Sequence, residues 1–200
     1  LRETRKLQNI RKGFSLVERV HAIQRAGMEV WSGMIVGFDH DEKGIFEAQR
    51  QFLKEARIAN AMIGMLTAIP KTPLHARLAK VGRLDPADPP SCGTNVIPLR
   101  MSREDLRDGY VKLMADVYTA DSYFDRLDRL YLDQRLVTTH GRTPYWQRHP
   151  WRRLQVNALF VAEAVAAYLR LMHGIPEAEL RREYRQRLWR VLRTRREPSV

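Results

Sequence analysis

The sequence predicts an α/β fold followed by an all-helical C-terminal part, and two observations carry this prediction. Two short apolar segments, 27–38 and 61–67, show no alternation of polar and apolar residues, which is typical of parallel strands covered on both faces. Between them, apolar residues repeat at helical spacing over 45–56. A strand, a helix and a strand with short connections form a right-handed crossover, so we expect the two strands to be parallel.

The composition bounds the size of the core and the kind of partner. A chain of 200 residues with 44% hydrophobic and 29% charged residues is long enough for one sizeable core and has no signature of disorder. The formal net charge of +12 would suit nucleic acid or an anionic membrane surface. The excess is arginine spread over helices without an interleaved aromatic ladder, which argues against direct binding of nucleic acid.

Three features indicate the cytoplasm. The single cysteine, Cys92, excludes an internal disulfide framework and fits a reducing compartment. No signal peptide is visible in the sequence. The most apolar run, 158–172, carries Glu163 and Arg170, which predicts a buried helix and no transmembrane segment.

Local signals place the first helix and the first strand. Ser15 and Glu18 form a capping box, in which each side chain satisfies an amide that a helix start leaves unpaired. Gly27 supplies the left-handed residue that ends this helix. In the strand that follows, Gly33 and Gly37 mark either close backbone packing or a ligand site, because α/β folds bind ligands at the carboxyl ends of parallel strands.

The polar residues behind the first strand predict a helix start. Asp39 and Glu42 form a second Asp-x-x-Glu capping box, at the beginning of the helix over 45–56. This explains Asp39 without a metal ion. Because Asp39, His40 and Asp41 are consecutive, they cannot all face one ion, and the sequence predicts no metal site.

The rest of the chain divides into three parts. We expect a first domain over 1–84, whose last helix starts at Thr72 with a hydroxyl cap and proline at the first helical position. The prolines and glycine of 85–100 predict a linker. Residues 101–200 are expected to form a helical domain, with helices beginning at Ser102 and extending over 151–173 and 177–195, and with a basic, aromatic loop around 140–149.

The edges of the predicted sheet imply further strands. Two parallel strands leave their outer edges unpaired, and each unpaired buried amide costs about 1 to 3 kcal/mol. The remaining sequence offers no convincing strand. We therefore expect the missing strands to precede Leu1, so that this chain is the closing segment of a larger α/β domain.

Several stretches carry a resemblance to a known family. Arg5-Lys-Leu-Gln-Asn9, Gly33-Met-Ile-Val-Gly37-Phe-Asp and Ala68-Ile-Pro-Lys-Thr-Pro-Leu74 resemble the later half of the barrel of radical S-adenosylmethionine (SAM) enzymes, above all the bacterial proteins with an N-terminal cobalamin-binding domain. The stretches 94–98 and 101–106 resemble the helical C-terminal domain of unknown function found on some of these proteins. The resemblance implies the closing β/α units of a partial TIM-like barrel, followed by an all-helical C-terminal domain.

The resemblance also implies a SAM site at the carboxyl edge of the barrel. The fifth strand of the family has the pattern Gly-x-Ile-x-Gly-x-x-Glu, and Gly33, Ile35 and Gly37 match it, with Ile35 against the adenine. His40 stands where the pattern has glutamate. The sixth strand contacts adenine through backbone groups near its end, which here implies the three residues Leu66, Thr67 and Ala68.

The family's cluster motif is missing from this chain. Family members hold a [4Fe-4S] cluster by three cysteines after the first barrel strand, whereas this chain contains one cysteine. The resemblance therefore implies that upstream regions of the same polypeptide bind the cluster and cobalamin, and that this chain alone is inactive. No catalytic residue is assigned.

The resemblance favours one function among three. The first is a radical SAM enzyme that methylates or rearranges an unreactive carbon of a small-molecule or lipid substrate through a 5′-deoxyadenosyl radical. The second is a basic RNA-binding or tRNA-modifying radical SAM module, although the RNA-modifying relatives end in a small β-barrel and this chain ends in helices. The third is a helical assembly domain without chemistry of its own.

Overall fold

The chain forms two compact units. The computed structural model describes residues 13, 15–85, 93–136 and 142–194. By the contacts between residues, the first unit comprises 1–24 and 30–130, and the second comprises 25–29 and 131–200. The predicted stretch Arg5 to Asn9 and the linker residues 86–92 lie outside the described residues. The structure is mixed α/β and mostly helical, and the partial barrel and the predicted domain boundaries stay predictions.

A two-stranded parallel sheet lies in the first unit. Strands β1 (Ser32–Val36) and β2 (Ala61–Met65) pair in register from Ser32 opposite Ala61 to Val36 opposite Met65. Helix α2 (Gly44–Glu55) connects them, and their parallel pairing confirms the predicted strand direction. Within the described part of the chain, no further strand pairs with the outer edge of either strand.

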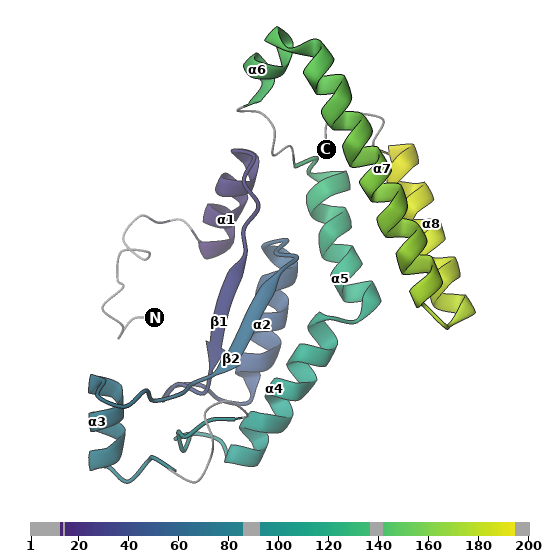
Figure 1. Ribbon diagram of the computed structural model, residues 1–200. Helices are drawn as coiled ribbons and strands as arrows, with labels where there is room; N and C mark the ends of the chain where they lie inside the picture. Colours follow the sequence, from purple (N-terminus) through teal and green to yellow (C-terminus); the bar gives the residue numbers. More distant parts are fainter. Residues whose placement is uncertain (1–12, 14, 86–92, 137–141, 195–200) are drawn as a thin grey trace. The chain divides into compact units, whose positions relative to one another are not determined.

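Helices cover one face of this sheet. Helices α1 (Leu16–Arg25), α2 and α4 (Arg103–Val117) contribute to one buried cluster together with the strand residues Ala61 and Ile63, and Figure 1 shows α2 behind the two strands. The opposite face is bare, since the side chains of Ile35 and Met62 are 47% and 76% exposed. The expectation that both faces are covered is therefore wrong for the described residues. An apolar pattern shows that both faces of a strand could be buried, but it does not show whether another element packs on each face.

Predicted caps begin three of the helices. The Ser15 hydroxyl accepts from the Glu18 amide at 3.1 Å, and the Ser15 amide donates to the Glu18 carboxylate. Ser102 and Asp105 make the same reciprocal box at the start of α4. Thr72 caps helix α3 (Pro73–Lys80) by accepting from the His75 amide at 3.2 Å.

The second predicted capping box is wrong. Lys43 occupies the N-cap position of α2 and makes no side-chain cap. The Asp39 carboxylate instead pairs with Arg77 and Arg83, two residues that lie more than thirty positions later in the sequence. Asp41, in turn, accepts from the backbone amides of Gly37 and Phe38. Distant arginines therefore bind both carboxylates that the local pattern assigned to the helix start, since Glu42 pairs with Arg100 at 2.7 Å.

A buried arginine joins α4 to the next helix of the first unit. Helix α5 (Ala120–Leu127) follows α4, and a π-helical segment η2 (Asp128–Asp133) continues it. The guanidinium of Arg126 is buried and donates to the carbonyls of Val117 at 2.8 Å, Ser122 at 3.0 Å and Ala59 at 3.3 Å. Burial lowers the pKa of Arg126 below its ordinary value.

The second unit is helical. It contains α6 (Thr143–Arg148), α7 (Pro150–Gly174) and α8 (Ala178–Thr194), and Figure 1 shows α7 and α8 as an antiparallel pair. Part of the loop predicted around 140–149 is thus the short helix α6. The expectation of a buried helix over 158–172 is wrong, because α7 has no buried residue. Among the described helices, α7 alone has a length and an apolar composition that would allow a membrane crossing.

Candidate functional site

The bare face of the sheet brings two of the predicted residues together. In the register of the strands Gly33 lies opposite Met62 and Ile35 lies opposite Gly64, so these four residues share the uncovered face. A Cβ atom added to Gly33 or Gly64 would meet nothing within 4 Å, and neither glycine has a positive φ. Neither backbone conformation nor packing within the described residues therefore explains why glycine occupies these two positions. Because the two residues have no side chains, they leave open space beside Ile35.

Gly37 has a different role from Gly33. Its φ is +100°, and an added Cβ would lie 3.0 Å from a Leu106 methyl group of α4. Its amide and that of Phe38 both donate to the Asp41 carboxylate at 2.9 Å. Backbone conformation and contact with α4 account for this glycine, which forms the turn at the carboxyl end of β1.

Two side chains from a later segment hold the end of β2. The Asn95 side chain accepts from the Ala68 amide at 2.8 Å and donates to the Ala68 carbonyl at 2.9 Å. The buried Thr94 hydroxyl donates to the Leu66 carbonyl and accepts from the Val96 amide. Leu66 and Ala68 are buried, and Thr67 lies partly exposed between them. The family resemblance implies that this backbone contacts adenine. Hydrogen bonds from Thr94 and Asn95 thus hold it on both sides of Thr67.

Helix α4 is tied to the same segment. Arg103, in its first turn, donates to the Thr94 carbonyl at 2.8 Å and pairs with Asp85. An antiparallel bridge joins Leu84 to Val96. The described end of the predicted linker is therefore packed against the carboxyl end of β2. Sequence reasoning missed Thr94 and Asn95, because no local pattern marks a side chain that binds backbone 27 or 28 positions away.

Asp39 is the centre of an ion-pair cluster beside these loops. Its carboxylate oxygens lie 2.5 Å from the Arg77 guanidinium and 2.7 Å from that of Arg83. Burial raises the pKa of Asp39, but the hydrogen bonds and charges of the two arginines outweigh burial and hold it below its ordinary value of 3.8. Asp39 therefore links the turn after β1 to α3, and the neighbouring His40 is exposed.

The side chains that could bind a metal ion or a cluster are dispersed over the described residues. No group of three or more His, Cys, Asp or Glu side chains converges anywhere in the described ranges. Cys92 lies outside them, and one cysteine does not meet the three thiolates of a site-differentiated [4Fe-4S] cluster. The residues of this chain therefore do not fit such a cluster.

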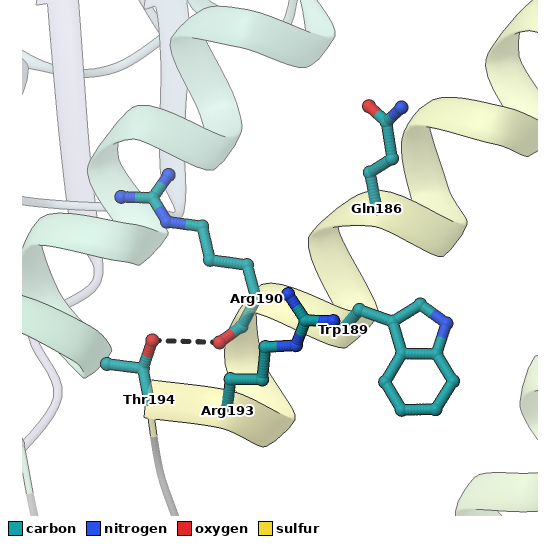
Figure 2. Close-up of a pocket in the computed structure, with 5 residues that line it drawn as sticks. All are labelled: Gln186, Trp189, Arg190, Arg193 and Thr194. Carbon is teal, nitrogen blue, oxygen red and sulfur yellow. Dashed lines mark hydrogen bonds between the residues drawn. The ribbon is translucent and has the colours of Figure 1, made fainter.

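Two surface hollows lie away from the carboxyl end of the sheet. One lies at the amino ends of the strands and is lined by Trp31, Ser32, Gly33, Asn60, Ala61, Met62 and Tyr118; the Tyr118 hydroxyl there accepts from the Ala61 amide at 3.2 Å and donates to its carbonyl. The other lies on α8 beside Trp189 and Arg193. Figure 2 shows the side chains that line it, among them Thr194, whose hydroxyl donates to the Arg190 carbonyl. Only Gly33 of the predicted site residues lines either hollow.

A family match covers most of the chain. The model of a domain of unknown function, DUF4070, matches residues 72–198, a range that begins before α3 and includes Thr94, Asn95 and all later described helices. No solved structure matches the chain.

Two curated proteins are similar to parts of the chain. An uncharacterized methyltransferase of Synechocystis sp. is 32% identical over 133 residues, which is 64% of this chain and 24% of that protein. The hopanoid C-2 methylase of Rhodopseudomonas palustris is 42% identical over 69 residues, or 34% of this chain and 13% of that protein. The chain therefore spans a quarter or less of the length of these relatives.

Proposed function

The chain belongs to the DUF4070 family, and we propose that it is part of a radical SAM methylase of the cobalamin-binding type. The names of the two relatives, a methyltransferase and a hopanoid C-2 methylase, support a methylase-type family. The sequence resemblance to radical SAM enzymes supports the choice of chemistry, and the family match over 72–198 supports the same relationship for the helical region.

One structural observation carries the proposed SAM site, namely the bare face of β1 and β2. Gly33 and Gly64 leave open space on that face beside Ile35, so an aromatic base could approach the backbone closely. The turn at Gly37 and the fixed segment from Leu66 to Ala68 border the carboxyl end of the sheet, where ligands of α/β folds bind. These residues fit the adenosine part of SAM, with Ile35 against the base and the backbone of Thr67 at its edge.

The other cofactors belong to different regions of the polypeptide in this proposal. A bound iron-sulfur cluster and cobalamin would supply radical generation and methyl transfer. This chain has one cysteine, so it contributes no cluster-binding motif. Its own residues position SAM and exclude water on one side of the site.

We extend the proposal to the class of substrate. One relative is named for a hopanoid, a polycyclic apolar lipid, and an apolar lipid offers the unreactive carbon that radical chemistry addresses. An apolar lipid substrate therefore fits better than a polar metabolite.

Methyl transfer tests this proposal. The natural polypeptide that contains this chain would be purified without oxygen, loaded with cluster and cobalamin, and incubated with a reductant, deuterated-methyl SAM, and a mixture of lipid extract and total RNA. We expect one labelled methyl group on an apolar lipid. Transfer to RNA with no labelled lipid would favour the tRNA-modifying alternative, and 5′-deoxyadenosine formation without any methyl transfer would contradict a methylase.

A further inference from the structure

The exposed apolar surface of the second unit is concentrated on α7. The helix has 25 residues and a length of about 37 Å, and none of them is buried. Trp151, Leu154, Val161, Val165 and Leu169 are all exposed. A soluble protein rarely exposes an apolar surface of this extent unless the surface binds something.

The exposed side chains of α7 include an apolar line and a charged line. Trp151, Leu154, Val161, Val165 and Leu169 are separated by three, seven, four and four residues, so they line one side of the helix. Leu159 and Phe160 are exposed as well and lie on other sides of the helix, so apolar exposure is not confined to the apolar line. Arg152, Glu163 and Arg170 are separated by eleven and seven residues, close to whole numbers of turns, and line another side. This geometry suits a helix that lies in a membrane interface, because a polar line along a spanning helix would face hydrocarbon.

Arginine dominates the charge around this surface. Residues 142–194 contain eleven arginines, four glutamates and neither lysine nor aspartate, which is a net charge of +7. Arg182, Arg185 and Arg193 of α8 are exposed, and Figure 2 shows Arg193 one turn from the exposed Trp189. A positive charge of this size complements an anionic surface.

Tryptophan is enriched in the same unit. Three of the four tryptophans of the chain, Trp146, Trp151 and Trp189, lie on α6, α7 and α8. Trp151 and Trp189 are exposed. Tryptophan favours the interfacial region of bilayers, where its apolar ring and its N–H group are both satisfied.

We propose that the α7–α8 pair binds the surface of an anionic lipid membrane, with α7 lying in the plane of the interface. The apolar line of α7 enters the boundary between headgroups and acyl chains, and the arginines of α7 and α8 contact lipid phosphates. Nucleic acid would match the arginines but not the apolar line. A protein surface would have to offer an apolar groove and an acidic rim together, whereas an anionic bilayer offers both chemistries over its whole plane. The inference stands on α7 and α8 and does not depend on the proposed methylase activity.

Vesicle binding tests the proposal. The 200-residue chain, checked for helical content by circular dichroism, is sedimented with phosphatidylcholine vesicles that contain either no phosphatidylglycerol or about one third of it. We expect binding to increase at least about tenfold with the anionic lipid and to weaken as salt rises. Trp151 fluorescence, measured with Trp31, Trp146 and Trp189 replaced by phenylalanine, should shift to the blue on binding.

A matched pair of variants tests which side of α7 binds. Leu169 and Phe160 are 60% and 61% exposed, and their separation of nine residues places them on opposite sides of the helix. Leu169→Glu should reduce vesicle binding at least about fivefold, whereas Phe160→Glu should have a much smaller effect. Circular dichroism of both variants checks that the helix persists.

Three results would overturn the proposal. The first is equal binding to neutral and anionic vesicles, or none to either, by folded protein. The second is an equal loss of binding for Leu169→Glu and Phe160→Glu. The third is a concentration-dependent dimer that Leu169→Glu dissociates while vesicle binding is absent, which would assign the surface to a second copy of the chain.

Discussion

The Asn95 side chain carries two hydrogen bonds to a single residue, and its removal should have a measurable cost. Asn95→Ala leaves the amide and the carbonyl of the buried Ala68 without these partners. We expect the free energy of unfolding to fall by about 1 to 3 kcal/mol, measured by urea denaturation. Gln51→Ala is the control, since it removes a side-chain amide from an exposed hydrogen bond to Glu55 on α2. An equal, small effect of both substitutions would show that the Asn95 contacts do not hold this segment.

Asp39 should make stability depend on pH in the acidic range. Its folded pKa lies below the ordinary value of 3.8, so its ion pairs stabilise the folded state fully above that value and lose this contribution as pH falls through the folded pKa. We expect the free energy of unfolding to fall more steeply between about pH 4 and pH 2 in the wild-type chain than in Asp39→Asn. Parallel pH profiles of the two proteins would contradict the role of the pairs with Arg77 and Arg83.

Single residues of the site were predictable to different extents. Gly33 and Ile35 were identified by the family pattern, and the structure places both on the bare face. Gly37 matched the same pattern, but its positive φ and its contact with Leu106 give it a structural reason that the pattern does not contain. Thr94 and Asn95 could not be identified, because their function depends on backbone that is distant in sequence.

At the scale of helices and strands, local interactions were predictable and long-range ones were not. The capping residues Ser15, Thr72 and Ser102 act within three positions of themselves, so the sequence alone contains their partners. The Asp39 carboxylate has competing partners from α3 and beyond, which no local pattern reveals. The exposure of α7 was not predictable either, because composition shows that a helix is apolar and does not show whether anything covers it.

The junction of α4 and α5 is held by the hydrogen bonds of Arg126. The planar guanidinium of Arg126 bonds carbonyls in two directions, and an ammonium group cannot reach all of them. Arg126→Lys should lower the free energy of unfolding by about 1.5 to 3 kcal/mol. Arg129→Lys is the matched control, because Arg129 is more exposed and pairs with Asp125 at 3.0 Å. Similar unfolding curves for both variants would show that Arg126 is not needed at this junction.

At the scale of the whole molecule, the outer edge of β1 tests whether further strands pair with this sheet. The Ser32 amide and the Val36 carbonyl bond toward β2, so the alternation of a parallel ladder directs the amides of Gly33 and Ile35 to the other edge. Hydrogen exchange at these two amides should be fast in the 200-residue chain and slow in the longer polypeptide that we propose contains it. The Met34 amide, which faces β2, is the internal control. Equally fast exchange at Gly33 in both proteins would contradict the pairing.

The affinity for SAM shows whether the bare face of β1 and β2 receives this ligand. Gly64 lies on that face and Gly44 lies at the start of α2, and an added Cβ would meet nothing within 4 Å at either position. The measurement is the SAM dissociation constant of the cluster-loaded natural polypeptide, by equilibrium dialysis, for Gly64→Leu and Gly44→Leu. We predict that Gly64→Leu raises the dissociation constant about tenfold or more, while Gly44→Leu leaves it unchanged and both variants keep the cluster absorbance of the wild-type protein. Equal dissociation constants for the two variants would contradict the assignment of this face to SAM.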